Sequence, residues 1–133
     1  PAEVENALRA AKVGRGIAHV FVRHTSCSVL IIENADAGVR RDLVALAQRW
    51  APDADPAYRH DTGGDDDMAA HARTLLAGVS MTVPVADAKL LLGTWQGIYL
   101  WEHRTQPHTR SVFVTVIALP ARRRALGLQR DLR

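Results

Sequence analysis

Four short strand-like segments follow one another between residues 79 and 119, and no helical segment separates them. They cover residues 79–85, 88–92, 97–104 and 111–119. The last of them is apolar on both faces, which predicts a central, buried strand. Because the strands and helices of the chain fall into separate runs, the sequence predicts an α+β fold with a largely antiparallel sheet.

The first part of the chain supplies the predicted helices and two further strands. The helices cover residues 2–13, a stretch ending near residue 50 and a stretch ending near residue 77, and the strands cover 17–23 and 27–33. Asn34 or Asp36 is predicted to cap the second helix and Asp65 the third, because short polar side chains satisfy free amides at a helix start. The irregular stretch 51–65 lies between these helices, and loops of this length often hold functional residues.

Composition limits both the class of protein and the kind of metal site. With 133 residues, of which 47% are hydrophobic, the chain is predicted to form one globular domain over residues 1–120. The single cysteine, Cys27, excludes an intrachain disulfide and cysteine-based metal sites. A transition metal therefore has to bind histidines and carboxylates. No uncharged apolar run approaches the roughly 18 residues of a membrane span, so no membrane partner is expected.

Positive charge is concentrated at the C-terminal end. Residues 121–133 contain five arginines and one aspartate, whereas the rest of the chain has 12 basic and 13 acidic residues. The body is close to neutral, so a basic face for nucleic acid is not predicted. Binding of the tail to nucleic acid or another anion stays open, although such a run is usually a solvated terminus.

Three polar residues, His24, Thr25 and Ser26, fall between two predicted strands. A histidine at the end of a strand can point into a cleft at the rim of the sheet. The alternative is a turn in which Thr25 and Ser26 satisfy backbone groups. The sequence leaves both interpretations open.

Three aspartates and a histidine stand together in residues 65–71. Carboxylates at a helix start are favoured by the helix dipole, which explains the aspartates without any function. His71 is predicted to face the core, because it shares a helical stripe with Met68, Ala72 and Leu75. Asp67 lies four residues before His71 and can contact it. A histidine in such a position can simply be hydrogen-bonded in the core. Because His60 lies in the preceding loop, we consider a ligand or catalytic role for His71 equally.

Two features between residues 93 and 110 also suggest a site. The segment Gly93–Gly97 has glycines suited to a tight turn, and Trp95 and Gln96 can pack on and hydrogen-bond a small ring. Trp95 can equally cover the core. Glu102 shares a strand face with apolar residues and needs a partner there. The candidates for that partner are His24, His71 and Arg110.

Four long motifs give the chain a family resemblance. They are HTSCSVLIIENAD from residue 24, HDTGGDDDMAAH from residue 60, GVSMTVPV from residue 78, and LLLGTWQGIYLWEHR from residue 90, with Arg110 before the last strand. Together they resemble the YjbQ family (UPF0047), also described as secondary thiamine-phosphate synthase enzymes. The resemblance spans about residues 1–119.

The resemblance implies two packed, mostly antiparallel sheets with about three helices, a homotrimer and a cytoplasmic location. It also implies weak thiamine-phosphate synthase activity, which joins an aminopyrimidine diphosphate to a thiazole phosphate and releases pyrophosphate. The alternative is a non-catalytic module that binds a small phosphorylated ligand or a metal. Family members usually begin with an extra strand that this sequence lacks, which leaves the completeness of one sheet in doubt.

If the chain is an enzyme of this kind, residues at the positions of the family pattern have candidate roles. His24, His60 and His71 are the expected metal ligands, and three histidines with an open position are typical of catalytic zinc. The expected catalytic residues are His24, His71, Asp66 and Glu102, with either carboxylate holding a histidine tautomer. The expected ligand-binding residues are Thr25, Ser26 and Arg110 for phosphate, with Asn34, Trp95 and Gln96 beside them and Trp95 stacked on a ring.

Overall fold

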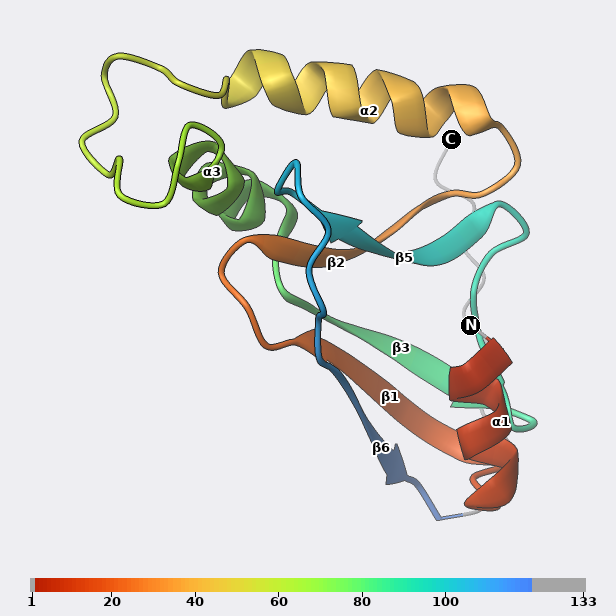
Figure 1. Cartoon of the computed structure of the whole chain (residues 1–133). Coiled ribbons are helices and arrows are strands. Elements are labelled where there is room, and N and C mark those ends of the chain that lie inside the picture. Colours follow the sequence, from red (N-terminus) through yellow and green to blue (C-terminus); the bar gives the residue numbers. More distant parts are fainter. Residues whose placement is uncertain (1, 121–133) are drawn as a thin grey trace.

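A computed structural model describes residues 2–120, and its strands form two antiparallel sheets (Figure 1). The four-stranded sheet has the order β4 (Lys89–Leu90), β3 (Ser80–Ala86), β1 (Arg15–Val22), β6 (Val112–Ala118), and the two-stranded sheet pairs β2 (Cys27–Glu33) with β5 (Gln96–Glu102). The helices are α1 (Ala2–Ala10), α2 (Ala37–Trp50) and α3 (Asp67–Ala77). The predicted α+β class and antiparallel pairing are confirmed.

The core lies between the two sheets. Alternate residues of β1, including Val20 and Val22, are buried, because successive side chains of a strand point to opposite faces. They pack against Cys27 and Val29 of β2. Each buried valine contributes about 1.5–3 kcal/mol by leaving water, so this layer fixes where the ends of β1 and β2 meet.

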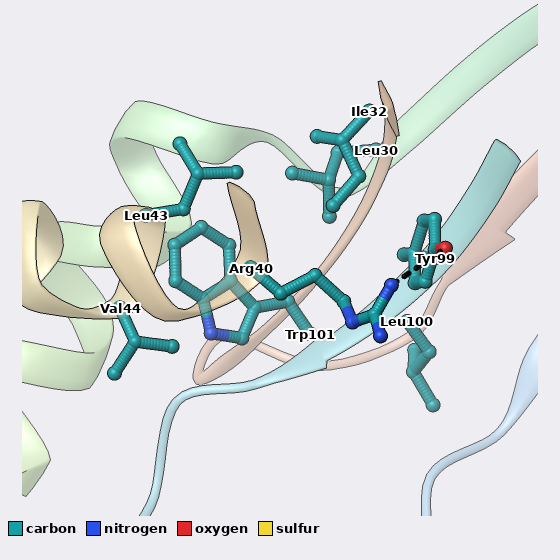
Figure 2. Close-up of a pocket in the computed structure, with 8 residues that line it drawn as sticks. All are labelled: Leu30, Ile32, Arg40, Leu43, Val44, Tyr99, Leu100 and Trp101. Carbon is teal, nitrogen blue, oxygen red and sulfur yellow. Dashed lines mark hydrogen bonds between the residues drawn. The ribbon is translucent and has the colours of Figure 1, made fainter. Parts of the chain in front are cut away.

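The second helix, α2, lies along the outer side of the two-stranded sheet (Figure 1). Its N-cap is Asp36, one of the two predicted caps, whose carboxylate accepts a 2.6 Å hydrogen bond from the amide of Gly38. An apolar cavity of about 150 Å³ separates α2 from β2 and β5, and Arg40 reaches across it to donate to the Tyr99 hydroxyl at 3.3 Å (Figure 2). The cavity is lined by Leu30, Ile32, Arg40, Leu43, Val44, Tyr99, Leu100 and Trp101.

The predicted inward stripe of α3 is wrong. Leu75 is 85% exposed and His71 lies on the flank of the helix, half-buried, whereas Ala70 and Arg73 are buried. The buried guanidinium of Arg73 donates to the carbonyl of Ala51 at 2.7 Å. The small residue Ala70 and the hydrogen-bonded Arg73 therefore set which face of α3 points inward. A search for apolar periodicity detects neither of them.

The last strand, β6, was predicted to be central and buried, and that prediction is also wrong. Within residues 2–120 it pairs only with β1 and forms an edge of the four-stranded sheet. Phe113 on one face and Val114 on the other are 49% and 38% exposed. An apolar strand indicates that its faces need cover, but the pattern does not tell which chain or segment provides it.

Two further predictions concern a membrane span and the C-terminal tail. Within the described residues, no helix has the length and hydropathy needed to cross a membrane. The basic tail predicted over residues 121–133 lies outside the described residues.

Candidate metal and acid–base site

Three potential ligand atoms meet where the 51–66 loop joins α3. The Nε2 atom of His60 lies 3.0 Å from Asp67 Oδ2, and His71 Nε2 lies 3.6 Å from the same oxygen. The ligand atoms of His60, Asp67 and His71 all lie within 4.8 Å of one another. The predicted contact between Asp67 and His71, one helical turn apart, is confirmed. Two imidazoles and one carboxylate are a donor set that can hold a metal ion.

The ring of His71 is held in the tautomer that a ligand needs. Its Nδ1 atom lies 2.9 Å from the carbonyl oxygen of Thr25 and must donate to it. In the neutral ring the Nε2 atom then keeps its lone pair, on the side of Asp67. Fixing the far nitrogen by a carbonyl is the usual way that proteins orient a metal-binding histidine.

Asp67 is itself fixed from two sides. Arg104 Nη1 donates to its Oδ1 atom at 2.6 Å. On the other side, Gly63 lies so close that a Cβ atom there would overlap the Asp67 carboxylate. Sequence reasoning missed Asp67 as a ligand and gave no role to Gly63 or Arg104. The glycine pair that precedes the three aspartates was the signal available.

His24 lies outside this three-residue group and has a network of its own. Its Nδ1 atom accepts from the amide and the hydroxyl of Ser26, both at 3.1 Å. Arg110 in turn donates to the same hydroxyl oxygen at 3.0 Å. Partial burial and the nearby charge of Arg110 lower the pKa of His24, so the ring is neutral near pH 7 and carries its proton on Nε2. His24 therefore presents a donor, whereas His71 presents a lone pair.

The partner predicted for Glu102 is found in Arg110. Its Nε atom donates to Glu102 Oε2 at 2.6 Å, and its Nη2 atom donates to Oε1. Burial opposes ionisation of Glu102, but hydrogen bonds from Arg110 and from the Arg104 amide outweigh it and lower the pKa. The Arg110 side chain is only 3% exposed. The predicted role of Arg110 in binding phosphate gains no support, because its guanidinium is committed to Glu102 and Ser26.

Asp66 also stabilises the fold around the site. It is the N-cap residue of α3 in place of the predicted Asp65, and its side chain does not cap the helix. Its Oδ2 atom accepts from the amide and the hydroxyl of Thr105 at 2.8 and 2.9 Å, and Arg104 pairs with its Oδ1 atom. These bonds, led by the Thr105 amide, lower the pKa of Asp66. Among the described residues, Asp67 rather than Asp66 or Glu102 is the carboxylate in contact with a histidine.

An open groove of about 750 Å³ adjoins the histidines. It runs between the end of β1, the turn to β2 and the C-terminal half of α3. Its lining residues are Phe21, Val22, Arg23, His24, Thr25, His71, Thr74, Leu75, Gly78 and Val79. The groove thus places His24 and His71, from different parts of the sequence, beside one space.

The remaining predicted ligand-binding residues lie at the other end of the two-stranded sheet. Gln96 pairs with Glu33, whereas Glu102 pairs with Cys27, so about 20 Å of strand separates the two ends. There Asn34 donates to the Gln96 carbonyl at 3.4 Å, and Trp95 is 63% exposed. A single chain therefore does not bring Asn34, Trp95 and Gln96 to the histidines.

A buried histidine lies close to the site and was missed from the sequence. His103 is 4% exposed, and its Nε2 atom lies 2.8 Å from the hydroxyl of Ser28. Burial, followed by the charge of Arg73, lowers its pKa to about 4. His108, by contrast, is exposed.

Comparison with known proteins supplies the family. The model for "UPF0047 protein YjbQ-like" matches residues 1–119. The chain is 45% identical to the UPF0047 protein sll1880 of Synechocystis, over 86% of this chain and 78% of that protein. It is 41% identical to the UPF0047 protein YjbQ of Salmonella typhimurium, over 78% and 75%.

The fold has solved counterparts as well. A crystal structure of an uncharacterized YjbQ/UPF0047-family protein from Clostridium acetobutylicum is 37% identical, with a TM-score of 0.79. It covers 87% of this chain, which covers 86% of it. The names of these relatives state no activity. The long motifs, the two-sheet fold and these matches agree, and the chain belongs to the YjbQ-like UPF0047 family.

Proposed function

We propose that His60, Asp67 and His71 bind a divalent metal ion. The supporting observation is that three ligand atoms from a loop and a helix lie within 4.8 Å of one another, with His71 already held in the ligating tautomer. Two histidines and a carboxylate leave one position of a tetrahedral ion open, and this donor set favours zinc. When bound, such an ion supplies positive charge that can neutralise a phosphate group.

The proposed ligand is a small phosphorylated molecule in the adjoining groove. The groove of about 750 Å³ falls in the size range of small-molecule sites. Thr25 and Thr74 line it, but the Thr74 hydroxyl is buried, so the donors on this wall are the Thr25 hydroxyl and the Nε2 hydrogen of His24. Donors on one wall and a metal group beside it suit an oxyanion.

The proposed reaction is the transfer that the family resemblance implies. An aminopyrimidine diphosphate and a thiazole phosphate would form thiamine phosphate, and pyrophosphate would leave. In this proposal the Nε2 hydrogen of His24 donates to an oxygen of the departing group, while the Arg110–Ser26 pair holds the ring. His71, Asp67 and His60 hold the metal. The second candidate is a module that binds the same phosphorylated ligand without catalysis, which the open, solvent-facing groove also suits.

A homotrimer is part of the proposal. The exposed apolar side chains of β6 are surface that contact with other copies would cover. Association would also give the distant Trp95 and Gln96 a route to the site of a neighbour. The cytoplasmic location implied by the family resemblance belongs to the same proposal.

Elemental analysis of the purified protein tests the metal site. We expect one zinc per chain after supplementation, and a loss of most of it in His60→Ala, Asp67→Asn and His71→Ala. His108→Ala removes an exposed histidine and is the matched control. Retention of zinc in His71→Ala would reject the proposed ligands.

Turnover then separates the two candidate functions. An enzyme forms thiamine phosphate in excess of one equivalent per chain, and this product depends on His24. A binding module saturates at one equivalent of ligand and forms no product. The second result would reject the transferase and keep the binding site.

A further inference from the structure

The arginines around the site differ in what their guanidinium groups contact. Arg110 binds Glu102, Arg104 binds Asp66 and Asp67, and Arg73 binds Asp53 and the carbonyl of Ala51. Each of these cations is neutralised by a carboxylate of the fold. None of the three belongs to the lining of the groove beside His24 and His71.

Arg23 is the exception. It is exposed and lines the groove directly beside His24. Within the described residues, no carboxylate lies within 4.0 Å of its guanidinium. Its contact is with an aromatic ring, because its Cζ atom lies 5.8 Å from the ring centroid of Phe113. A cation–π contact at an exposed site is worth only about 0.5–1 kcal/mol, so the guanidinium is available for a stronger partner.

The backbone at Arg23 is nevertheless fixed. Its amide donates to the carbonyl of Ser111 at 3.1 Å, and the preceding Val22 donates to the carbonyl of Val79 at 2.9 Å. The backbone at the end of β1 is therefore hydrogen-bonded to the segments that precede β6 and β3, one on each side. An exposed cationic side chain on a fixed backbone, beside a groove, suits the capture of a ligand from solvent.

We propose that Arg23 binds the anionic group of the ligand in this groove, a phosphate or a diphosphate. A guanidinium offers paired N–H donors that match the oxygens of a phosphate, and such charge-assisted pairs are roughly twice as strong as neutral hydrogen bonds. Thr25, with its hydroxyl, and the Nε2 donor of His24 border the same space. The inference rests on the groove being the ligand site proposed above, and it gives to Arg23 the role that the sequence predicted for Arg110.

Calorimetric titration with inorganic pyrophosphate tests this role, first on metal-free protein and then on zinc-loaded protein. We expect Arg23→Gln to weaken pyrophosphate binding about tenfold in both forms, the loss of roughly one charge-assisted contact. The pyrophosphate affinity of Arg23→Lys should lie between those of the wild type and Arg23→Gln, because lysine keeps the charge and loses the paired donors. Arg41→Gln on α2 removes the same charge from an exposed position outside the groove and should bind like the wild type.

The outcomes separate Arg23 from the metal site. Equal affinities of Arg23→Gln and Arg41→Gln, or no binding of millimolar pyrophosphate by the wild type, would overturn the role of Arg23. Loss of zinc in Arg23→Gln would also overturn it, since the residue would then be structural. If pyrophosphate binds through Arg23 while the wild type takes up no zinc, the proposed metal site fails and the anion site stands.

Discussion

At the scale of single residues, the site depends on exact distances between small groups. Gly63 illustrates this, because any side chain at this position would overlap the Asp67 carboxylate. The tautomers of His24 and His71 depend equally on one contact each, the Ser26 amide and the Thr25 carbonyl. A small substitution at Gly63, or the loss of either contact, is therefore expected to change metal binding or proton donation more than the fold.

Gly63→Ala is expected to lower zinc affinity by about tenfold or more, as loss of a group that positions a ligand usually does. The new methyl group displaces Asp67 from His60 and His71. Zinc content and competition with a chelator measure the effect. Gly14→Ala is the control, since a Cβ atom there meets nothing within 4 Å. Unchanged affinity in Gly63→Ala would remove Asp67 from the ligand set.

The buried His103 is expected to make the free energy of unfolding depend on pH. Its folded-state pKa of about 4 lies below the ordinary 6.5, so between these values the unfolded chain binds a proton that the folded chain does not. Its contribution, about 1–3 kcal/mol, is complete above pH 6.5 and is lost as the pH falls to 4. Urea unfolding should show a smaller loss over this range in His103→Gln than in His108→Gln. Equal losses in the two variants would show that His103 is not the group responsible.

At the scale of elements, short polar contacts decide how each helix is placed. α2 begins where Asp36 caps it, and α3 is turned by Arg73 rather than by an apolar stripe. The cavity between α2 and the two-stranded sheet indicates loose apolar packing there (Figure 2). The start of α2 should therefore depend measurably on its cap.

Asp36→Ala is expected to destabilise the protein by about 1 kcal/mol, because the Gly38 amide loses its acceptor. Urea unfolding of the folded chain measures this free energy. Asp42→Ala removes an exposed carboxylate from the middle of α2 and should change stability by less than half as much. A similar loss in both variants would assign the effect to helix charge rather than to the cap.

At the scale of the whole molecule, the four-stranded sheet ends, among residues 2–120, in the apolar edge strand β6. Phe113 and Ile117 of β6 are 49% and 54% exposed on the same outer face. Monomeric proteins usually protect such an edge with charges or cover. In the proposed homotrimer this surface is covered by other copies.

Light scattering is expected to give three times the 14.6 kDa chain mass. Ile117→Glu should lower the mass toward a single chain, because it places a charge in the covered surface. Arg49→Glu on α2 is the control for a change of charge elsewhere. A single-chain mass for the wild type, or an unchanged trimer in Ile117→Glu, would contradict this assignment of the interface.

The sequence by itself determined the local structure of this protein. Strand runs, a helix capped by Asn34 or Asp36, and the contact between Asp67 and His71 one helical turn apart follow from patterns within a few residues, which neighbouring side chains and backbone geometry enforce. The need of Glu102 for a partner was also visible, because a carboxylate on an apolar face is costly unless it is paired. The family motifs added the fold and the candidate histidines.

Only the tertiary structure decided which of those residues meet. It joined His60 to Asp67, left His24 with Ser26, and committed Arg110 to Glu102. It also separated Trp95 from the histidines by the length of a sheet, and left β6 at an edge. The physical reason is that such contacts depend on strand register, helix rotation and loop path, which are set by packing between distant segments rather than by local pattern.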